Sequence, residues 1–276
     1  MTVLNGASIR AISFDVTGTL VVHTTAVAEA YAQCARWAQL RDPPTAEELR
    51  PAFKKAYREA SATKPSFGHY DGKGDRAWWK YAVRLTMEYA GRDYDDDEFE
   101  RCFRRIYQHY GSPRGYSELA DVRGCLDALT DRGLVLGVTS NTASRTVETT
   151  LPLLGLHTYF HWFACSEDVG ADKPEKKMFD ASVGLAKFWC PDLAPHEVLH
   201  VGDNFAVDFC GARAAGLQAL YLDRKGGTTN FQDWVVGPEY PGKCDDDVRD
   251  HTIHTLAAII PILDDDDNPL IVNKKK

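Results

Sequence analysis

The sequence predicts an α/β fold, in which a helical unit is inserted into a core built on a parallel sheet. Five short apolar runs are continuous rather than alternating in polarity, which is typical of strands buried on both faces. Helical patterns separate most of these runs, and strands that alternate with helices form parallel sheets through right-handed crossovers. One long stretch, residues 22–116, has no convincing strand pattern, which indicates a helical insertion.

The predicted strands are the apolar runs themselves. In chain order they are residues 9–14, 134–139, 162–165, 198–201 and 218–222. Helices are expected at 117–132, 175–188 and 207–215, because apolar side chains recur there at helical spacing. Gly133 follows the first of these helices and is a favourable residue for ending it. The segment 223–250 is rich in Gly, Pro and Asp and is expected to be mostly loop.

The insertion carries three apolar stripes at helical spacing. They lie within residues 27–38, 79–89 and 99–110. The glycine-rich segment 64–75 is its most irregular part. We therefore expect two units, a core formed by residues 1–21 and 117–276 and a helical cap formed by residues 22–116.

Composition and charge exclude several classes of protein. The chain of 276 residues has a formal net charge of −8, whereas a protein that binds nucleic acid is usually basic. No apolar run approaches the length of a membrane span, so no membrane partner is expected. Nothing in the composition indicates the oligomeric state.

The cysteines and the two ends of the chain bear on its compartment. Seven cysteines include no C-x-x-C pair, which argues against a zinc site and fits a reducing compartment. The first predicted strand begins near Ile9, which leaves no room for a secretion signal before it. Charged runs at 264–267 and 274–276 are interpreted as a solvated tail. We expect a cytoplasmic protein, with the nucleus as an alternative.

Polar residues follow four of the predicted strands, close to the point where each strand ends. In chain order they are Asp15, then Ser140 with Asn141, then Lys173, then Asp203 with Asp208. The carboxyl ends of parallel strands meet at one edge of an open sheet, where ligands bind. Each residue alone would be interpreted as a cap or a turn. Four such groups in order, each behind its own strand, indicate one shared site.

These residue types suit a magnesium and phosphoryl site. Mg²⁺ prefers oxygen ligands, and Asp15 and Asp203 can supply two carboxylates. A carboxylate can also attack phosphorus, which gives an aspartyl phosphate and splits one difficult step into two. Lys173 would add positive charge, while Ser140 and the backbone N–H groups of the turn at 15–18 would hold phosphoryl oxygens. We therefore predict a small phosphorylated substrate and Mg²⁺ as the cofactor.

The order of these motifs resembles that of the haloacid dehalogenase superfamily. Its four motifs are matched by "DVTGTL", "TSN", "DKP" and "GDNFAVD", and the resemblance runs from about Ile9 to Leu263. Two longer stretches, "RAWWKYAV" and "HVGDNFAVDFCGARAAGL", are similar to the haloacid dehalogenase-like hydrolase domain-containing protein 3 group. The resemblance implies a Rossmann-like core, and the insertion looks like the first-type cap of that superfamily.

The resemblance also implies catalytic and metal-binding roles. Asp15 would be the nucleophile, Lys173 would steady the charge, and Asp208 would orient the lysine or a metal-bound water. Asp15, Asp203 and the backbone carbonyl of Thr17 would ligate Mg²⁺. The protein would then be a hydrolase that acts on phosphate monoesters or acyl phosphates through an aspartyl phosphate.

Phosphate binding is assigned by the same resemblance to Ser140 and Asn141, together with Thr17 and Gly18 of the first turn. Thr17 is where this sequence departs from the superfamily, because most of its phosphatases have there a second Asp that acts as general acid and base. A threonine hydroxyl cannot replace it at neutral pH, and losing a general acid–base group typically costs ~10²–10⁴ in rate. The same pattern resembles the P-type ATPases, whose aspartyl phosphate needs assistance to hydrolyse. We expect slow turnover and a preference for aryl or acyl phosphates.

Two alternatives stay open. A haloacid dehalogenase uses an Asp nucleophile without a metal, but an unfilled acidic site at Asp203 and Asp208 would repel a haloacid carboxylate. A binding or regulatory protein that keeps the fold and has lost catalysis is supported by Thr17. His200 in the fourth strand and the pair Trp78–Trp79 are interpreted as packed side chains.

Overall fold

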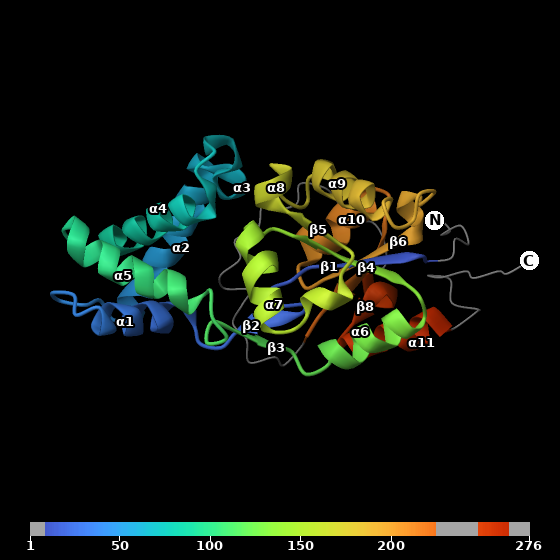
Figure 1. The fold of residues 1–276 in the computed structure, drawn as a ribbon, viewed down its shortest axis with the longest axis horizontal. Coiled ribbons are helices and arrows are strands. Elements are labelled where there is room, and N and C mark those ends of the chain that lie inside the picture. Colours follow the sequence, from blue (N-terminus) through green and yellow to red (C-terminus); the bar gives the residue numbers. More distant parts are fainter. Residues whose placement is uncertain (1–8, 225–247, 265–276) are drawn as a thin grey trace, which may run out of the picture.

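The computed structural model describes residues 9–224 and 248–264. Its core is a six-stranded sheet in which every neighbouring pair is parallel, in the order β5-β4-β1-β6-β7-β8 (Figure 1). The strands are β1 Ala11–Phe14, β4 Val135–Ser140, β5 Trp162–Cys165, β6 Val198–Gly202, β7 Gln218–Leu222 and β8 Thr252–Ile253. The predicted α/β fold with a parallel sheet is therefore confirmed. No sequence pattern indicates β8, because a strand of two residues is too short to form an apolar run.

The register of the sheet brings the ends of β1, β4 and β6 together. Phe14, the last residue of β1, lies opposite Val138 of β4 and Val201 of β6. The polar residues one or two positions beyond each of these three therefore emerge at the same edge of the sheet.

Helices cover both faces of the sheet. They are α6 Val122–Asp131 and α11 Ile259–Asp264 on one face, and α9 Lys176–Ala186 and α10 Gly211–Ala214 on the other (Figure 1). Successive residues of a strand point to opposite faces. Accordingly, Ile12 joins the hydrophobic cluster under α6 and α11, and Ala11 joins the cluster under α9 and α10. Shorter helical segments in the core are η2 Thr146–Thr150, α7 Leu151–Leu153, α8 Ser166–Val169 and η5 Phe205–Cys210.

Two short strands differ from the sequence prediction. β2 Val21–His23 and β3 Tyr116–Glu118 pair antiparallel at the two points where the chain leaves the core and returns to it. The helix expected from residue 117 begins only at Val122 for this reason. Neither strand has an apolar run, since half-exposed and polar residues make up most of both. Their partners are also far apart in sequence, so periodicity cannot reveal the pairing.

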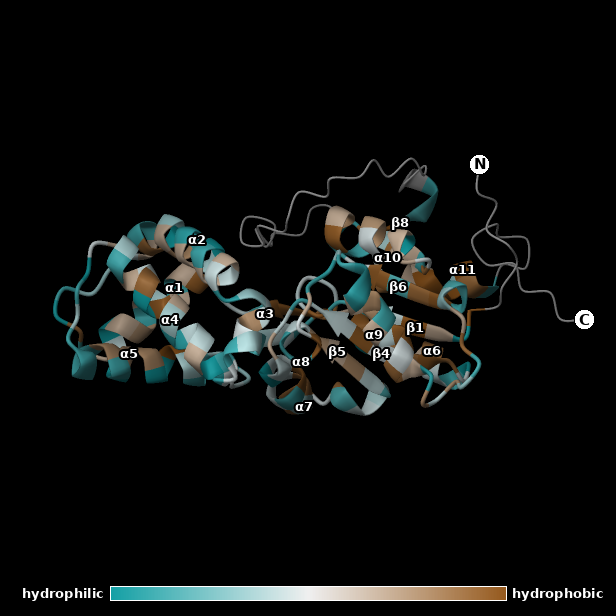
Figure 2. Ribbon diagram, turned by 90° about the horizontal axis from the view of Figure 1, so that it is seen from above, coloured by the Kyte–Doolittle hydropathy of each residue, from teal (hydrophilic) through white to brown (hydrophobic). Residues whose placement is uncertain are grey.

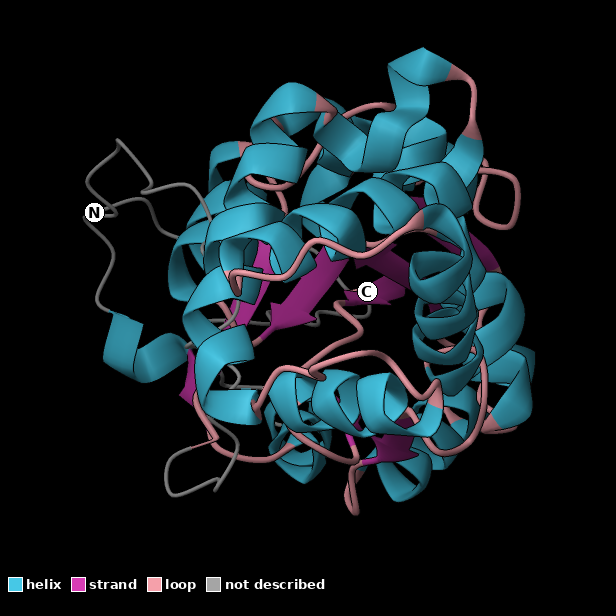
Figure 3. Cartoon of the chain, turned by 90° about the vertical axis from the view of Figure 1, so that its left-hand side faces the viewer, coloured by secondary structure: helices cyan, strands magenta, loops and turns pink. Residues whose placement is uncertain are grey.

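Between these two strands the chain forms a helical unit. Its helices are α1 Val27–Trp37, α2 Ala46–Thr63, α3 Pro65–Gly68, α4 Gly74–Tyr89 and α5 Asp96–His109. The unit has its own hydrophobic cluster, which includes Tyr31, Leu49, Phe99 and Phe103. Figure 2 shows the unit beside the core, with α3 near α8. Figure 3, viewed from the end where the unit lies, shows the strands of the core behind its helices.

Among the residues that the structure describes, no helix is both long enough and apolar enough to span a membrane. The predicted loop at 223–250 lies almost wholly outside the described residues, as do residues 265–276 of the predicted charged tail. Asp264, the last described residue, pairs with Arg132 at 2.7 Å.

Candidate active site

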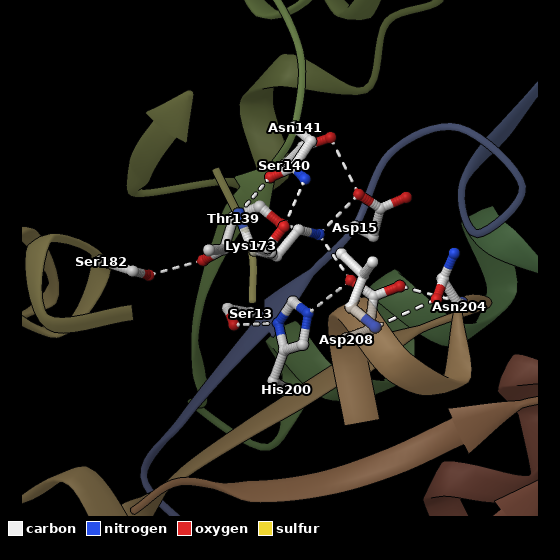
Figure 4. Close-up of polar contacts among 11 residues, drawn as sticks. Ser13, Asp15, Thr139, Ser140, Asn141, Lys173, Ser182, His200, Asn204 and Asp208 are labelled. Atoms are coloured by element: carbon white, nitrogen blue, oxygen red, sulfur yellow. Dashed lines mark hydrogen bonds and ion pairs between the residues drawn. The ribbon is translucent and has the colours of Figure 1, made fainter. Parts of the chain in front are cut away.

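Asp15 lies directly after β1, at the edge of the sheet. Its backbone N–H donates to the carbonyl of Val201 in β6 at 2.9 Å, which continues the ladder one residue beyond the strand. Asp15 is only 9% exposed. The carboxylate oxygen Oδ1 accepts hydrogen bonds from Ser140 Oγ at 2.9 Å and Lys173 Nζ at 2.7 Å (Figure 4). Burial raises the pKa of Asp15, although Lys173 opposes this effect.

Lys173 connects three parts of the site. Its ammonium group donates to Asp15 Oδ1 at 2.7 Å, to Asp208 Oδ1 at 2.6 Å and to the carbonyl of Thr139 at 2.7 Å (Figure 4). A lysine has three such donors, so all of them are used. Burial alone would lower the pKa of this 1% exposed lysine, but the two carboxylates raise it. Lys173 is therefore a fixed positive charge beside Asp15.

Asp208 also contacts a residue of β6 and a residue of the loop that follows this strand. Its carboxylate accepts from the backbone N–H of Asn204 at 2.9 Å and lies 3.2 Å from His200 Nε2. Burial acts to raise the pKa of Asp208, but Lys173 and His200 hold it well below its usual range. Asp208 is therefore ionised and directed at the lysine.

His200 is packed, as interpreted from the sequence, and it also contacts the site. It is fully buried in β6, with Ser13 Oγ 2.7 Å from Nδ1 and Asp208 3.2 Å from Nε2. Burial lowers the pKa of His200. The sequence pattern carries no signal for this contact, because a histidine inside an apolar strand gives no indication of its neighbours.

Three carboxylates converge at this edge of the sheet. One oxygen each from Asp15, Asp203 and Asp208 lie within 4.8 Å of one another. The pKa of Asp203 is raised well above its usual range, first by burial and then by the charges of Asp15 and Asp208. Such crowding of like charges is costly without a cation, and a hard divalent ion with oxygen ligands fits this set of donors.

Gly18 makes the approach of Asp203 possible. A Cβ at this position would lie 2.2 Å from Asp203 Oδ2, and the backbone has a φ of +90°, which favours glycine. The N–H of Gly18 donates to the carbonyl of Val21 at 2.8 Å, so it is committed within the turn. The geometry thus gives Gly18 a steric role beside the carboxylate cluster.

Asn141 and Thr17 differ in what their side chains do. The amide of Asn141 is used at both ends, because Oδ1 accepts from the N–H of Lys173 at 2.6 Å and Nδ2 donates to its carbonyl at 2.8 Å. Asn141 therefore anchors the loop that carries the lysine. Thr17 lines a chamber of about 570 Å³, which is also lined by Asn141 and Lys173 and, on its other walls, by the helical unit.

A family model described as haloacid dehalogenase-like hydrolase matches residues 9–216. The chain belongs to this family of hydrolases. Its sequence is 31% identical to the haloacid dehalogenase-like hydrolase domain-containing protein 3 of Homo sapiens over 258 residues, which are 93% of this chain and 94% of that protein. It is 28% identical to the glyceraldehyde 3-phosphate phosphatase of Methanopyrus kandleri over 261 residues, 92% of this chain and 97% of that protein. The resemblance predicted from the motifs is confirmed.

Solved structures share the fold. The HAD-hydrolase YfnB of Bacillus subtilis, bound to magnesium, is 19% identical with a TM-score of 0.63, over 94% of this chain and 100% of that one. A 2-haloacid dehalogenase from Pseudomonas syringae is 23% identical with a TM-score of 0.62, over 93% of this chain and 98% of that one. At these identities the likeness is one of fold, and it includes proteins of different reactions.

Proposed function

We propose that the protein is a Mg²⁺-dependent phosphohydrolase that transfers a phosphoryl group from a small substrate to Asp15 and then to water. One observation carries the proposal. The Asp15 carboxylate, 2.7 Å from Lys173 and 2.9 Å from Ser140, shares a cluster with Asp203 and Asp208 in which one oxygen of each carboxylate lies within 4.8 Å of the others. The proposed substrate is a phosphate monoester or acyl phosphate of the cytoplasm.

The charge of the site supports a divalent cation. Three carboxylates face one ammonium group, so the site is negative before an anionic phosphate arrives. Mg²⁺ would be held by Asp15, Asp203 and the carbonyl of Thr17, and when bound it would neutralise the repulsion between nucleophile and substrate.

The first step is proposed for a specific oxygen of Asp15. Both hydrogen bonds described above fall on Oδ1, so we assign the attack on phosphorus to Oδ2. A new bond forms between this oxygen and phosphorus, and the leaving oxygen departs with the bonding electrons. Lys173 holds the nucleophile in place and offsets the charge that develops, and Ser140 is close enough to do the same for a phosphoryl oxygen.

We infer that the second step is slow. Thr17 has no carboxylate to deprotonate the water that attacks the aspartyl phosphate. Leaving groups that depart without a proton are favoured for the same reason. The family relatives that act on phosphates support the reaction class, because the Methanopyrus protein is named for its action on glyceraldehyde 3-phosphate.

The helical unit is proposed to act as a cap, formed by residues 22–116, over a core formed by residues 1–21 and 117–276. Support comes from the chamber, since it is lined by Lys173 and Asn141 of the core and by Trp78 and Phe103 of the helical unit. A cap that closes over such a chamber excludes water from the reacting groups.

A binding protein that has lost catalysis is the second candidate. It is favoured by Thr17 and by the fact that protein acceptors use all three donors of Lys173. A dehalogenase is disfavoured, because the carboxylate of a haloacid would meet Asp203 and Asp208.

The test is detection of the covalent intermediate. The protein is mixed with acetyl phosphate and MgCl₂, quenched in acid, and its intact mass is measured. We expect the mass to increase by one phosphoryl group, with the modification on Asp15 and absent from Asp15→Asn and from samples with EDTA. Turnover that persists in Asp15→Asn would contradict the proposed nucleophile, and binding of phosphate without any covalent product would favour the second candidate.

A further inference from the structure

We propose that the leaving group of the substrate is aromatic, so that the protein acts on a small aryl phosphate. This inference rests on the proposed phosphoryl transfer to Asp15, and it selects one leaving-group class among those that the site chemistry permits. Its evidence lies in the chamber beyond the catalytic residues.

The chamber has a polar end and aromatic walls. Thr17, Asn141 and Lys173 line the end at the edge of the sheet. The walls from the helical unit are largely aromatic, and they include Tyr57, Phe67, Trp78, Trp79, Phe103 and Tyr107. Its volume of about 570 Å³ is in the range of sites that enclose a small ligand.

The aromatic wall is already assembled. Trp78 lies with its ring centroid 4.8 Å from that of Trp79 and 4.9 Å from that of Phe67, and Tyr57 is 5.4 Å from Trp78. These are the separations at which aromatic rings stack or meet edge to face. The indole N–H of Trp78 donates to the carbonyl of Lys64 at 2.8 Å, and Trp78 is only 2% exposed, so this ring supports the wall from behind. The half-buried rings of Tyr57 and Trp79 are the surface that the wall offers to a guest. A flat ring would extend this cluster, whereas a sugar would lose hydrogen bonds to water on entering it.

The wall is tied to the phosphoryl site. Ser66 Oγ donates to Asp172 at 3.2 Å. This hydrogen bond links the segment that carries Phe67 to the loop that carries Lys173. Ser66 and Phe67 both have positive φ, at 50° and 55°, so this backbone is held in a conformation that such residues rarely adopt. An aromatic group in the chamber would therefore lie beside a phosphate that reacts at Asp15 next to Lys173.

Thr17 supports the same class for an independent reason. Because it cannot donate a proton to the leaving oxygen, the group must depart as an anion. A phenolate, whose conjugate acid has a pKa of about 10, is a far better leaving group than the alkoxide of a sugar. The bond between phosphorus and the aryl oxygen breaks, its electrons stay on that oxygen, and the phenolate takes a proton from water afterwards. An acyl phosphate meets this condition too, but a small acyl group has no ring to fill the chamber.

The helical unit is also joined to the core beside the chamber, which Asp75 lines. Tyr70 Oη donates to the carbonyl of Gly170 at 2.6 Å, and the backbone N–H of Asp75 donates to Glu167 at 2.8 Å. These contacts favour a free small molecule over a phosphotyrosine that is carried on a protein surface.

The experiment compares leaving groups and removes one wall residue. Initial rates with Mg²⁺ are measured for naphthyl phosphate, acetyl phosphate, glycerol phosphate and a phosphotyrosine peptide. We expect kcat/KM to be highest for naphthyl phosphate and lowest for glycerol phosphate. Trp79→Leu should reduce the ratio of kcat/KM for naphthyl phosphate over acetyl phosphate by about ten-fold, the effect of losing one good aromatic contact. Trp37→Leu, which changes an aromatic side chain 62% exposed and outside the chamber, should leave this ratio unchanged.

A binding measurement separates this inference from the reaction itself. Naphthylmethyl phosphonate cannot transfer its phosphoryl group, and its binding is followed by quenching of tryptophan fluorescence. We expect it to bind at least ten-fold more tightly than methyl phosphonate, and Tyr57→Leu should weaken binding if Trp79→Leu does not fold. Equal affinities for the two phosphonates, or a preference for the peptide, would overturn the aryl class even if Asp15 is phosphorylated. Selective binding of the aryl phosphonate without phosphorylation of Asp15 would support the chamber and overturn the proposed hydrolysis.

Discussion

Each side chain around Asp15 has its charge state determined by its neighbours. Lys173 stays protonated because it lies between Asp15 and Asp208, and Asp208 stays ionised because it faces Lys173 and His200. Asp203 differs, since it adds a third carboxylate whose pKa is raised by burial and by the charges of Asp15 and Asp208. At the scale of single residues the site is therefore prepared for one more positive charge, and Thr17 is the position where a proton-transfer group is missing.

Replacing Thr17 with Asp tests that assignment. A carboxylate there could deprotonate the attacking water, so steady-state turnover of an aryl phosphate should rise by ~10-fold or more, the low side of the general-base range. In wild type, a pre-steady-state burst of phenolate should precede slow turnover, because the intermediate accumulates. Thr17→Asn is the matched control, since it changes size and polarity without adding a base. No burst in wild type and no gain in Thr17→Asp would mean that Thr17 does not replace a general base.

At the scale of elements, the sequence predicts what depends on local pattern. The continuous apolar runs are buried strands, Asp15 and Asp203 directly follow β1 and β6, and Ser140 is the last residue of β4. The pairing of β2 with β3 depends on residues almost a hundred positions apart, so no local period indicates it.

One helix departs from its prediction for a reason that lies in the site. The expected helix at 207–215 begins instead as the π-helical turn η5 Phe205–Cys210 and continues as α10. Asn204 caps it by accepting from the N–H of Val207 at 3.0 Å, and its own N–H donates to Asp208 at 2.9 Å. Such turns occur often at functional sites. The periodicity of apolar residues cannot predict this turn, because the turn depends on the hydrogen bonds that orient the Asp208 carboxylate.

Glu167 connects the helical unit to the core at the element scale. Its carboxylate accepts from the backbone N–H of Asp75 at 2.8 Å and from that of Ser144 at 2.9 Å, while its carbonyl contacts the ring of His69. Glu167→Ala should loosen the segment 64–75, so we expect faster hydrogen exchange there and a several-fold increase in KM. Loss of one charge-assisted hydrogen bond is worth about 1.5–3 kcal/mol, which corresponds to a roughly ten- to hundred-fold increase in the local opening that hydrogen exchange measures.

The control for this prediction is Glu88→Ala, because Glu88 is an exposed residue of α4. It should change neither hydrogen exchange in the segment 64–75 nor KM. Unaltered exchange in Glu167→Ala would show that other contacts hold the helical unit against the core.

At the scale of the whole molecule, the site and the stability of the fold are coupled. Asp15 and Asp203 directly follow β1 and β6 at the centre of the sheet, so the repulsion between carboxylates acts on two strands that also carry the main hydrophobic clusters. An ion that binds only the folded chain stabilises it by about 2.7 kcal/mol at a hundred times its Kd. We therefore expect Mg²⁺ to raise the melting temperature of wild type and EDTA to reverse this shift.

Asp203 and Asp208 should respond to neutralisation in opposite directions. Burial and neighbouring charges raise the folded-state pKa of Asp203 above its unfolded value of about 4. Ionisation of Asp203 therefore lowers the stability of the fold as the pH rises from about 4 through the folded-state pKa. Asp203→Asn should therefore raise the metal-free melting temperature at pH 7–8 by about 2–4 °C, the equivalent of ~1 kcal/mol. The same variant should lose the Mg²⁺ shift. The folded-state pKa of Asp208 is lowered, so its contribution is present above about pH 4 and is lost as the pH falls below that value.

Asp208→Asn should destabilise the protein at neutral pH by about 3–5 kcal/mol, because it leaves Lys173 with one buried carboxylate partner fewer. The two variants remove the same charge within one cluster, so they are matched controls for each other. Melting curves at pH 5 and pH 8, with MgCl₂ or EDTA, provide the measurement. The buried His23 and His200 have lowered pKa values, so they destabilise the fold of both proteins as the pH falls. The contribution of Asp203 is therefore taken from the difference between the two proteins. The gain in metal-free melting temperature of Asp203→Asn over wild type should be larger at pH 8 than at pH 5. If Asp203→Asn instead lowers the metal-free melting temperature and keeps the Mg²⁺ shift, Asp203 stabilises the fold by itself and the cation binds elsewhere.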